Sequence, residues 1–436
     1  MKLSVVGLGK LGAPLAAVMA FKGHEVIGLD LNDSFVKAIN SGMAPVEEPQ
    51  LQLLIDQSRE RLRGTTDWNQ LIAESEVTFL IVPTPSDPNG FFTNRYILDA
   101  LKPIGEALRK KTTYHLVVIT STVMPGSTGG EIREALEKAS GRIVGEHLGL
   151  CYNPEFIALG SVVRDMLNPD FILIGENDAK AGAILEGIYS TSCDNKPLIR
   201  RMNFSNAELT KISVNTFVTT KISYANMLAD ICDRLPGADV DVVTNAVGSD
   251  SRIGTKYLKG AMGYGGPCFP RDNVAFCALA KKLGARADLA EATDKINKYQ
   301  VGRIMGMIEA ILPVGKKVGI LGLSYKPQTG VAEESQSVFL VAALRDHGYS
   351  VALFDPLALP NALKMIGSDR LHTCDSAGAC AKDADLLIVA TPWPEFKELS
   401  SDSLKAGAVI IDLWRTLPRE RFAAHRILYL GKGPES

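Results

Sequence analysis

The residue with the clearest chemical potential is Cys268, in the segment GYGGPCFPRD. A thiol that loses its proton is a strong nucleophile and can form covalent intermediates with carbonyl groups. Four glycines lie on the approach to it and would let the backbone come close to a ligand: Gly260, Gly263, Gly265 and Gly266. We expect a helix to begin at Asp272, with an N-terminal end that favours a thiolate or an oxyanion. The alternative is a small buried apolar residue, as we expect for the other six cysteines.

Lys211 and Asn215 are four positions apart in a long stretch of helical periodicity. Both side chains would therefore project from one face of a helix. An ammonium and an amide on one face could stabilise a developing oxyanion. A solvated polar stripe is the alternative.

The N-terminal segment has the pattern of a dinucleotide site. Gly7, Gly9 and Gly12 follow an apolar strand and open a helix near Pro14, which is the context that GxGxxG requires. Asp30 closes the next strand, where its carboxylate could accept both ribose hydroxyls and repel the extra phosphate of NADP. The sequence thus predicts NAD binding, the alternative for Asp30 being a strand-end carboxylate that faces water.

Thr84 and Thr122 follow the third and fourth expected strands. The carboxyl ends of parallel strands line the ligand crevice of such a sheet, so both threonines are candidate cofactor contacts. Ordinary loop threonines are an equally good interpretation of the pattern alone.

Composition excludes several classes of protein. The 436 residues are 46% hydrophobic with a formal net charge of −2, so neither a nucleic-acid groove nor a basic membrane face is indicated. We expect no membrane span. Seven scattered cysteines match a reducing compartment, and the cytoplasm is the expected location. The six histidines are dispersed and no HExxH or paired CxxC occurs, so no metal is implied.

The order of apolar segments predicts an α/β fold with two Rossmann-like, doubly wound parallel sheets joined by a helical middle part. The expected domains are an NAD-binding domain over residues 1–200, a helical central domain with Cys268 over 201–312, and a second Rossmann-like, nucleotide-binding domain over 313–436. GHEVIGLD at 23–30 is echoed by GYSVALFD at 348–355, which suggests two nucleotide sites.

Several ordered motifs make the whole chain resemble the UDP-glucose/GDP-mannose dehydrogenase family. They are GLGKLG, VPTPSD at 82–87, STVMPGST at 121–128, NPEF at 153–156, NPDFILIG at 168–175, AELTKISVNTF at 207–217, SRIG at 251–254, GYGGPCFPRD and GLSYKP at 322–327.

The resemblance implies oxidation of a sugar C6 hydroxymethyl to a carboxylate in two steps that consume two NAD. Cys268 would capture the aldehyde as a thiohemiacetal, which is oxidised to a thioester and hydrolysed. Glu155 is similar to the family's general base, with Thr122 placing the water, and Asp272 is similar to the residue that assists proton transfer near the thiol. Lys211 and Asn215 would stabilise the oxyanion.

The resemblance also supplies binding residues. The candidate cofactor contacts gain Leu11 and Arg271. The candidate substrate contacts are Glu155, Phe156, Lys211, Asn215, Arg252, Tyr257, Lys259, Gly265, Phe269, Tyr325 and Lys326. Arg252 matches an arginine that reaches into a neighbouring subunit's site, so a homodimer or higher oligomer is expected. The apolar face from Ile212 to Leu228 could form its seam or be buried within one chain.

Two positions depart from the family pattern. Leu159 stands where a second glutamate often follows NPEF, and Glu333 stands where an arginine usually precedes Glu-Ser. The first departure weakens the assignment of the hydrolytic base, and the second warns against copying the substrate of any one relative.

Three functions remain open from the sequence. A four-electron dehydrogenase of UDP-glucose, UDP-N-acetylmannosamine, GDP-mannose or TDP-glucose is the leading hypothesis. The second hypothesis is a different NAD enzyme, either a thiol-dependent enzyme that oxidises an aldehyde or a two-electron hydroxy-acid dehydrogenase. Either enzyme would leave the second nucleotide domain unexplained. A non-catalytic nucleotide-binding protein would have no need for Cys268, Lys211, Asn215, Glu155 and Asp272 together.

Overall fold

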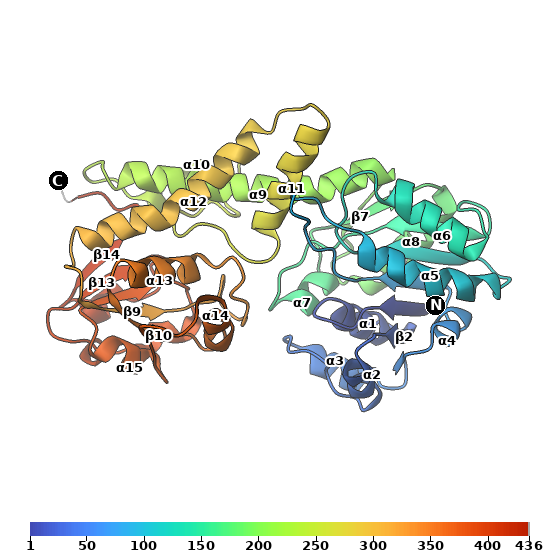
Figure 1. The fold of residues 1–436 in the computed structure, drawn as a ribbon, viewed down its shortest axis with the longest axis horizontal. Helices are drawn as coiled ribbons and strands as arrows, with labels where there is room; N and C mark the ends of the chain where they lie inside the picture. The colour runs from blue at the N-terminus through green and yellow to red at the C-terminus, as the bar shows by residue number, and fades with distance from the viewer. Residues whose placement is uncertain (435–436) are drawn as a thin grey trace. The chain divides into compact units, whose positions relative to one another are not determined.

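The computed structural model describes residues 1–434. The described residues form two compact units, the first over Met1–Ser213 and the second from Val214 onward. Each unit contains one β-sheet of the doubly wound type, and helices separate the two sheets in the chain (Figure 1). The predicted fold class is confirmed. The three domain boundaries expected from the sequence stay a prediction.

The first unit is built on an eight-stranded sheet of order β3-β2-β1-β4-β5-β6-β7-β8. Its strands are parallel except for the antiparallel pair β6 and β7. The strands are β1 (Lys2–Val6), β2 (Glu25–Leu29), β3 (Leu62–Thr65), β4 (Val77–Leu80), β5 (His115–Ile119), β6 (Leu148–Tyr152), β7 (Phe171–Glu176) and β8 (Leu198–Met202).

Alternating side chains of the central strands fill two separate cores, one on each face of this sheet. Val5, Phe79 and Val118 belong to one core, whereas Leu80 and Ile119 belong to the other. This alternation follows from the period of two in a β-strand, and burial on both faces explains the continuous apolar runs that marked these strands in the sequence.

Helices cover the two faces of the first sheet, and Figure 1 shows α5 and α6 side by side on it. They are α1 (Gly12–Phe21), α2 (Asp33–Asn40), α3 (Leu51–Gln57), α4 (Trp68–Ala73), α5 (Arg95–Arg109), α6 (Arg133–Ser140), α7 (Val162–Leu167) and α8 (Ala179–Ser192), with a π-helical turn η1 (Thr128–Ile132) before α6. The long helix α9 (Phe204–Cys232) contains the boundary between the units.

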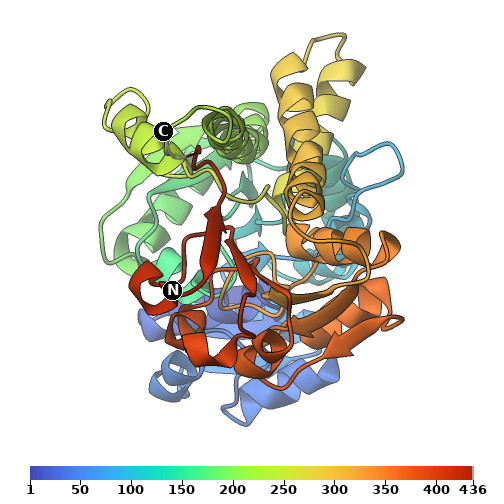
Figure 2. The ribbon, with the colours of Figure 1, turned by 90° about the vertical axis from the view of Figure 1, so that its left-hand side faces the viewer.

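The second unit has a six-stranded parallel sheet of order β11-β10-β9-β12-β13-β14, which Figure 2 shows in orange and red toward the viewer. Its strands are β9 (Lys317–Leu321), β10 (Ser350–Phe354), β11 (Leu371–Thr373), β12 (Leu386–Val389), β13 (Val409–Asp412) and β14 (Arg426–Tyr429). Its helices include α10 (Val240–Gly248), α11 (Phe269–Lys282), α12 (Asp288–Glu309), α13 (Gln336–Asp346), α14 (Leu359–Ile366) and α15 (Ala377–Lys382).

Most of the strands that the sequence missed are short or polar, although the missed strand β6 is apolar and buried inside the sheet. β3 is LRGT, β8 is LIRRM and β11 has three residues, and each lies at an edge of its sheet. An edge strand shares less of its surface with the core, so it lacks the apolar run that identifies a central strand. Among the described residues no helix combines the length and the apolar character needed to cross a bilayer.

A row of buried, hydrogen-bonded polar side chains connects three strands of the first sheet. The Oγ of Ser4 lies 2.7 Å from Thr78 Oγ1, which lies 2.8 Å from Nε2 of His115. His115 is fully buried, and this burial, with the nearby positive charges of Lys111 and Arg142, lowers its pKa to about 3. His115 is therefore neutral in the folded protein at any pH above about 4.

A lowered histidine pKa makes the folded state bind fewer protons than the unfolded state between about pH 3 and pH 6.5. Stability contributed by neutral His115 is complete above the unfolded pKa and is lost as the pH falls below it. Between pH 7.5 and pH 5 we expect the unfolding free energy of the first unit to fall by about 2 kcal/mol more than in His115→Gln, measured by urea titration.

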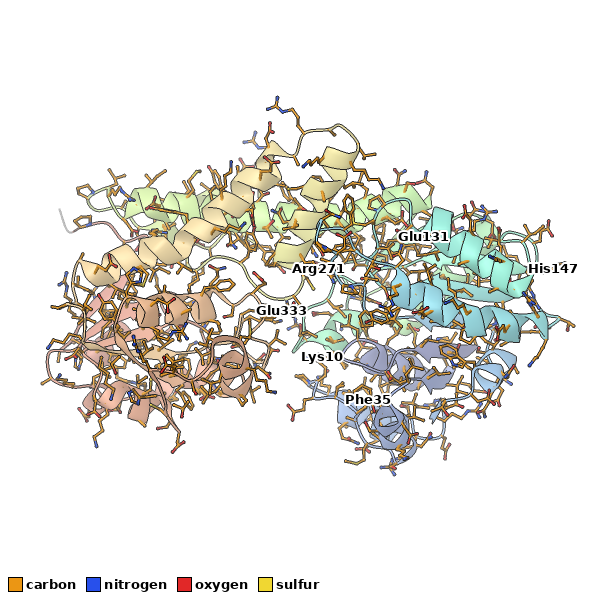
Figure 3. The ribbon with its side chains drawn as sticks, in the orientation of Figure 1. Lys10, Phe35, Glu131, His147, Arg271 and Glu333 are labelled. Atoms are coloured by element: carbon orange, nitrogen blue, oxygen red, sulfur yellow. The ribbon has the colours of Figure 1, made fainter. Side chains whose placement is uncertain are left out.

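The matched control is His147→Gln, because His147 is exposed (Figure 3). It should keep the pH dependence of the wild type. An equal pH dependence in His115→Gln and the wild type would contradict the role given to His115.

Candidate active site

The turn after β1 holds three glycines that meet different constraints. Gly7 has φ +95°, and a Cβ there would lie 2.0 Å from the carbonyl oxygen of Ile81. A Cβ on Gly12 would lie 1.7 Å from the carbonyl oxygen of Gly7. A Cβ on Gly9 would meet no atom within 4 Å. Gly7 and Gly12 are thus required by packing, while Gly9 leaves the backbone open to a ligand.

The N-terminus of α1 lies directly after this turn, which Figure 3 marks by Lys10. Leu11 occupies the N-cap position, and its side chain makes no capping hydrogen bond. The amide groups of a first helical turn are positive and need acceptors. A pyrophosphate fits this arrangement, because its oxygens can accept from such amides.

Asp30 lies at the end of β2 and is partly exposed. Its two carboxylate oxygens accept hydrogen bonds from the backbone N–H groups of Leu8 and Asn32, each at 2.7 Å. These bonds fix the carboxylate at the glycine turn, and each oxygen keeps a further lone pair for a ribose hydroxyl. The first unit therefore has the donors, the open backbone and the acceptor that a dinucleotide requires.

Asp355, the counterpart of Asp30 in the second unit, has a different environment. It is 4% exposed, and its carboxylate accepts from the backbone N–H groups of Leu323, Ser324, Leu357 and Ala358 and from the indole of Trp393. These donors use its accepting capacity within the fold. The repeated sequence thus gives two similar strands, but Asp355 is buried and its carboxylate is bonded within the fold.

Thr84 and Thr122 lie together at the carboxyl ends of β4 and β5, as the sequence predicted from strand order. The hydroxyl of Thr84 donates to the carbonyl oxygen of Thr122 at 2.7 Å. Beside them Ser121 Oγ accepts from the N–H of Val82 at 2.9 Å and donates to its carbonyl oxygen at 2.7 Å. These bonds join the two loops that follow the strands.

Glu208 is a buried residue of this site that the sequence argument missed. Its carboxylate accepts from the N–H groups of Gly126 at 2.6 Å and Thr128 at 2.7 Å, in the loop after β5. Burial raises the pKa of Glu208, and these bonds oppose the shift. Glu208 precedes Lys211 by one helical turn, so it fixes the start of α9 against the loop that contains Thr122.

Glu155 and Lys211 lie close together. The Nζ of Lys211 donates to the backbone carbonyl of Glu155 at 2.6 Å and lies 4.6 Å from the centre of the Phe156 ring. The hydroxyl of Tyr189 is 3.4 Å from the Glu155 carboxylate. Burial raises the pKa of Glu155 to about 7, against the charge of Lys211 and the Tyr189 hydrogen bond. A carboxylate with this pKa is suited to act as a base near neutral pH.

The loop after Glu155 is fixed by core packing and by hydrogen bonds to a distant carboxylate. Leu159 packs against the core of the first unit, so its side chain is committed to packing. Glu48, which the sequence argument also missed, accepts from the N–H groups of Gly160 at 3.0 Å and Val162 at 2.8 Å. The loop is thereby anchored without the second glutamate of the family pattern.

Cys268 is exposed and is the N-cap residue of α11. The helix begins at Phe269, three residues before the position expected from the sequence, and the N–H of Asp272 donates to the carbonyl oxygen of Cys268 at 2.8 Å. Asp272 is buried in the first turn, where Asn215 Nδ2 donates to its carboxylate at 2.6 Å. The thiol therefore lies at the positive end of the helix dipole.

The glycines before Cys268 allow close packing on the loop that precedes α13. A Cβ on Gly265 would lie 2.2 Å from the carbonyl oxygen of Glu334, and one on Gly266, with φ +83°, would lie 2.5 Å from the Tyr325 ring. The N–H of Gly266 donates to the backbone carbonyl of Glu333 at 3.1 Å. Figure 3 labels Glu333 here and Arg271 on α11. This contact uses the backbone of Glu333, so it does not depend on the missing arginine.

Two buried asparagines hold the same loop from the helices around it. Asn226 of α9 accepts from the N–H of Ala261 at 2.9 Å and donates to the carbonyl oxygen of Met262 at 3.1 Å. Asn297 of α12 accepts from the N–H of Tyr264 at 2.7 Å and donates to its carbonyl oxygen at 3.0 Å. No sequence motif marked these residues, because an asparagine in a helix carries no signal of its partner.

The other candidate substrate residues of the second unit are partly gathered around Cys268. Tyr257 has φ +62°, and its ring lies edge-on to Phe269 at 6.3 Å. The Nζ of Lys326 lies 5.8 Å from the ring of its neighbour Tyr325. Lys259 and Arg252 are both exposed. The guanidinium of Arg252 forms a salt bridge with the carboxylate of Asp250 at 2.6 Å. The expected role of Arg252 in a neighbouring subunit's site stays a prediction.

Models of one family match most of the chain. The UDP-glucose/GDP-mannose dehydrogenase family is matched by its NAD binding domain over residues 1–193, its central domain over 205–299 and its UDP binding domain over 319–419. The chain belongs to the UDP-glucose/GDP-mannose dehydrogenase family. The resemblance found in the sequence is confirmed.

Individual relatives agree over nearly the full length. UDP-glucose 6-dehydrogenase AglM of Haloferax volcanii is 36% identical over 94% of this chain and 96% of its own. GDP-mannose 6-dehydrogenase of Pseudomonas putida is 31% identical over 95% and 96% of the two chains. The structure of a UDP-glucose dehydrogenase from Pyrobaculum islandicum superposes with a TM-score of 0.89 at 32% identity, over 98% and 96% of the chains.

This family member is an NAD-dependent nucleotide-sugar dehydrogenase. The predicted cofactor and the class of substrate are thereby confirmed. The roles of single site residues, the dimer and the cytoplasmic location stay predictions.

Replacing Asp30 tests the ribose contact. In Asp30→Ala the carboxylate is lost, so we expect the KM for NAD to rise about tenfold and the preference for NAD over NADP to fall. Initial-rate kinetics with both cofactors measure this. Asp33→Ala, on the exposed start of α2, is the matched control. An unchanged cofactor preference in Asp30→Ala would count against the ribose role.

Proposed function

We propose that this chain oxidises the C6 hydroxymethyl of a UDP-glucose-like nucleotide sugar to the uronate, with Cys268 as the nucleophile. The observation that carries the proposal is the exposed thiol of Cys268 at the N-cap of α11. NAD, when bound, accepts a hydride in each of the two oxidations.

The thiol acts on the product of the first oxidation. Its sulfur adds to the aldehyde carbon to form a thiohemiacetal, and the second oxidation converts this adduct into a thioester. A thiolate is favoured at a helix N-terminus, and the covalent bond keeps the aldehyde from leaving between the steps. Phe269 and Tyr257 beside Cys268 supply an apolar surface for the substrate.

Lys211 and Asn215 are proposed to stabilise the oxyanion that develops on the reacting carbon. Their support is local: Lys211 is anchored on the Glu155 carbonyl, and Asn215 is anchored on Asp272. Anchored donors need little reorganisation during the reaction. Asp272, fixed by Asn215 in the first turn of α11, is the proposed partner for proton transfer at the thiol.

Glu155 is proposed to deprotonate the water that hydrolyses the thioester, with Thr122 helping to place this water. A pKa of about 7 gives Glu155 both a substantial ionised fraction at neutral pH and a useful affinity for the proton. Leu159 takes no part, since its side chain packs against the core. Glu155 then carries the hydrolytic step without the second glutamate.

The identity of the sugar nucleotide is a finer part of the proposal. Relatives at 36% and 31% identity are named for UDP-glucose and GDP-mannose, so similarity alone favours UDP-glucose only slightly. The match of residues 319–419 to a UDP binding domain supports uridine. The remaining substrates to compare are UDP-N-acetylmannosamine, GDP-mannose and TDP-glucose.

A homodimer is also proposed. The sequence offered the face from Ile212 to Leu228 as its seam, but Ile212 is buried. Phe217, Tyr224 and Ile231 of α9 are 64%, 45% and 53% exposed. Their spacing of seven residues forms an apolar stripe, which supports association of two copies along this helix.

The nucleophile is tested by NADH stoichiometry over a panel of UDP-, GDP- and TDP-sugars. We expect the wild type to release two NADH per molecule of its substrate. Cys268→Ser should lose the second oxidation, so any residual turnover stops at the aldehyde, and Cys277→Ser should behave as the wild type. Full uronate formation by Cys268→Ser would exclude the covalent mechanism, and one NADH per sugar in the wild type would exclude the four-electron reaction.

The base is tested by the pH dependence of the second half-reaction. Since Glu155 must be ionised to accept a proton, the rate should fall about tenfold per pH unit below pH 7. Glu155→Gln should lower the rate about 100-fold and remove this acid limb. Stopped-flow hydrolysis of the thioester measures both. An acid limb retained in Glu155→Gln would assign the base elsewhere.

A further inference from the structure

A pair of cysteines lies in the second unit, in a part of the fold that the proposed reaction does not use. Cys374 directly follows β11, and Cys380 lies in α15. Five residues separate them in the sequence CDSAGAC. Both are free thiols.

Hydrogen bonds to backbone carbonyl groups of two adjacent strands hold the two residues near each other. The N–H of Cys374 donates to the carbonyl oxygen of Leu353 in β10 at 2.9 Å, and the thiol of Cys380 donates to the carbonyl oxygen of Ile320 in β9 at 3.6 Å. Leu353 and Ile320 are direct partners in the register of β9 and β10. Neighbouring strands are about 4.8 Å apart, so the cysteines are attached to adjacent points of the sheet.

The side chains of the two cysteines also pack in one part of the core. Cys374 packs against the core cluster that contains Cys380. Two cysteines that are anchored on paired residues of adjacent strands and packed in one cluster are candidates for a disulfide, which needs Cβ atoms about 4 Å apart.

The two thiols differ in their access to solvent. Cys374 is partly exposed, whereas Cys380 is fully buried in the core cluster that also contains Trp393 and Phe396. Burial raises the pKa of Cys380, as does the neighbouring Cys374. An oxidant from solvent therefore meets Cys374 first, and Cys380 is a protected second thiol.

We propose that Cys374 and Cys380 form a reversible oxidation site that takes hydrogen peroxide as its oxidant. Cys374 attacks one peroxide oxygen, the O–O bond breaks, and sulfenic acid and water form. The sulfur of Cys380 then attacks the Cys374 sulfur, and the leaving hydroxide takes the Cys380 proton as a second water. Two thiols thus lose two electrons and two protons, and one peroxide becomes two water molecules.

The arrangement resembles a reactive thiol with a resolving partner. A lone exposed cysteine proceeds to sulfinic and sulfonic acids, which are irreversible in most settings. A nearby second thiol captures the sulfenic acid and preserves a state that thiols can reduce. Oxidation also ends the donation from Cys380 to Ile320, two residues before the Gly322 turn that leads to Tyr325 and Lys326.

The test uses full-length Cys268→Ser, which removes the exposed thiol of the proposed active site. After treatment with hydrogen peroxide and blocking of free thiols, peptide mass spectrometry should find a Cys374–Cys380 link that dithiothreitol reverses. Adding Cys374→Ser should abolish the link, whereas adding Cys277→Ser, a partly buried cysteine of α11, should leave it intact.

A second measurement covers the case of a damaged fold. In Cys268→Ser/Cys374→Ser, whose melting temperature is compared with that of the parent, Cys380 should be oxidised at least about tenfold more slowly. Cys374 that goes directly to sulfinic acid while Cys380 stays free, or two thiols that both stay reduced, would overturn the proposal. So would an equal rate of Cys380 oxidation with and without Cys374.

Discussion

Backbone hydrogen bonds of the loop from Ala261 to Gly266 hold the candidate nucleophile in place. The loop is irregular, so its N–H and C=O groups have no helix or sheet partners, and leaving them unpaired in a buried setting would cost free energy. Asn226 and Asn297 supply those partners, and Glu333 supplies a carbonyl. These hydrogen bonds fix the loop that leads to Cys268 and thereby the position of its thiol.

Close packing and hydrogen bonding reinforce one another in this loop. The glycines allow the backbone to reach Glu334 and Tyr325, and only at that distance does the N–H of Gly266 reach Glu333. A side chain at Gly265 would displace the loop against a backbone atom that has little freedom to move. The glycine run is therefore a packing requirement as well as an opening for a ligand.

In the first unit, the surroundings of Glu155 keep the pKa of its carboxyl group close to neutral pH. Burial of Glu155 alone would favour its protonated form strongly, and the charge of Lys211 limits this effect. Lys211 is in turn fixed by the Glu155 carbonyl and the Phe156 ring, while Glu208 fixes the start of the same helix. Base, cation and helix are thus parts of one local arrangement.

The sequence by itself determined the two sheets, the glycine turn with Asp30 and the segment of Cys268, because strand runs, GxGxxG and an ordered set of motifs are local signals. Only the tertiary structure distinguished Asp30 from Asp355. The carboxylate of Asp30 is partly exposed, whereas that of Asp355 is buried and accepts from the indole of Trp393. The tertiary structure also identified Glu208, Asn226 and Asn297. Their partners are from 33 to 82 residues away in the chain, and no local pattern encodes a contact of that range.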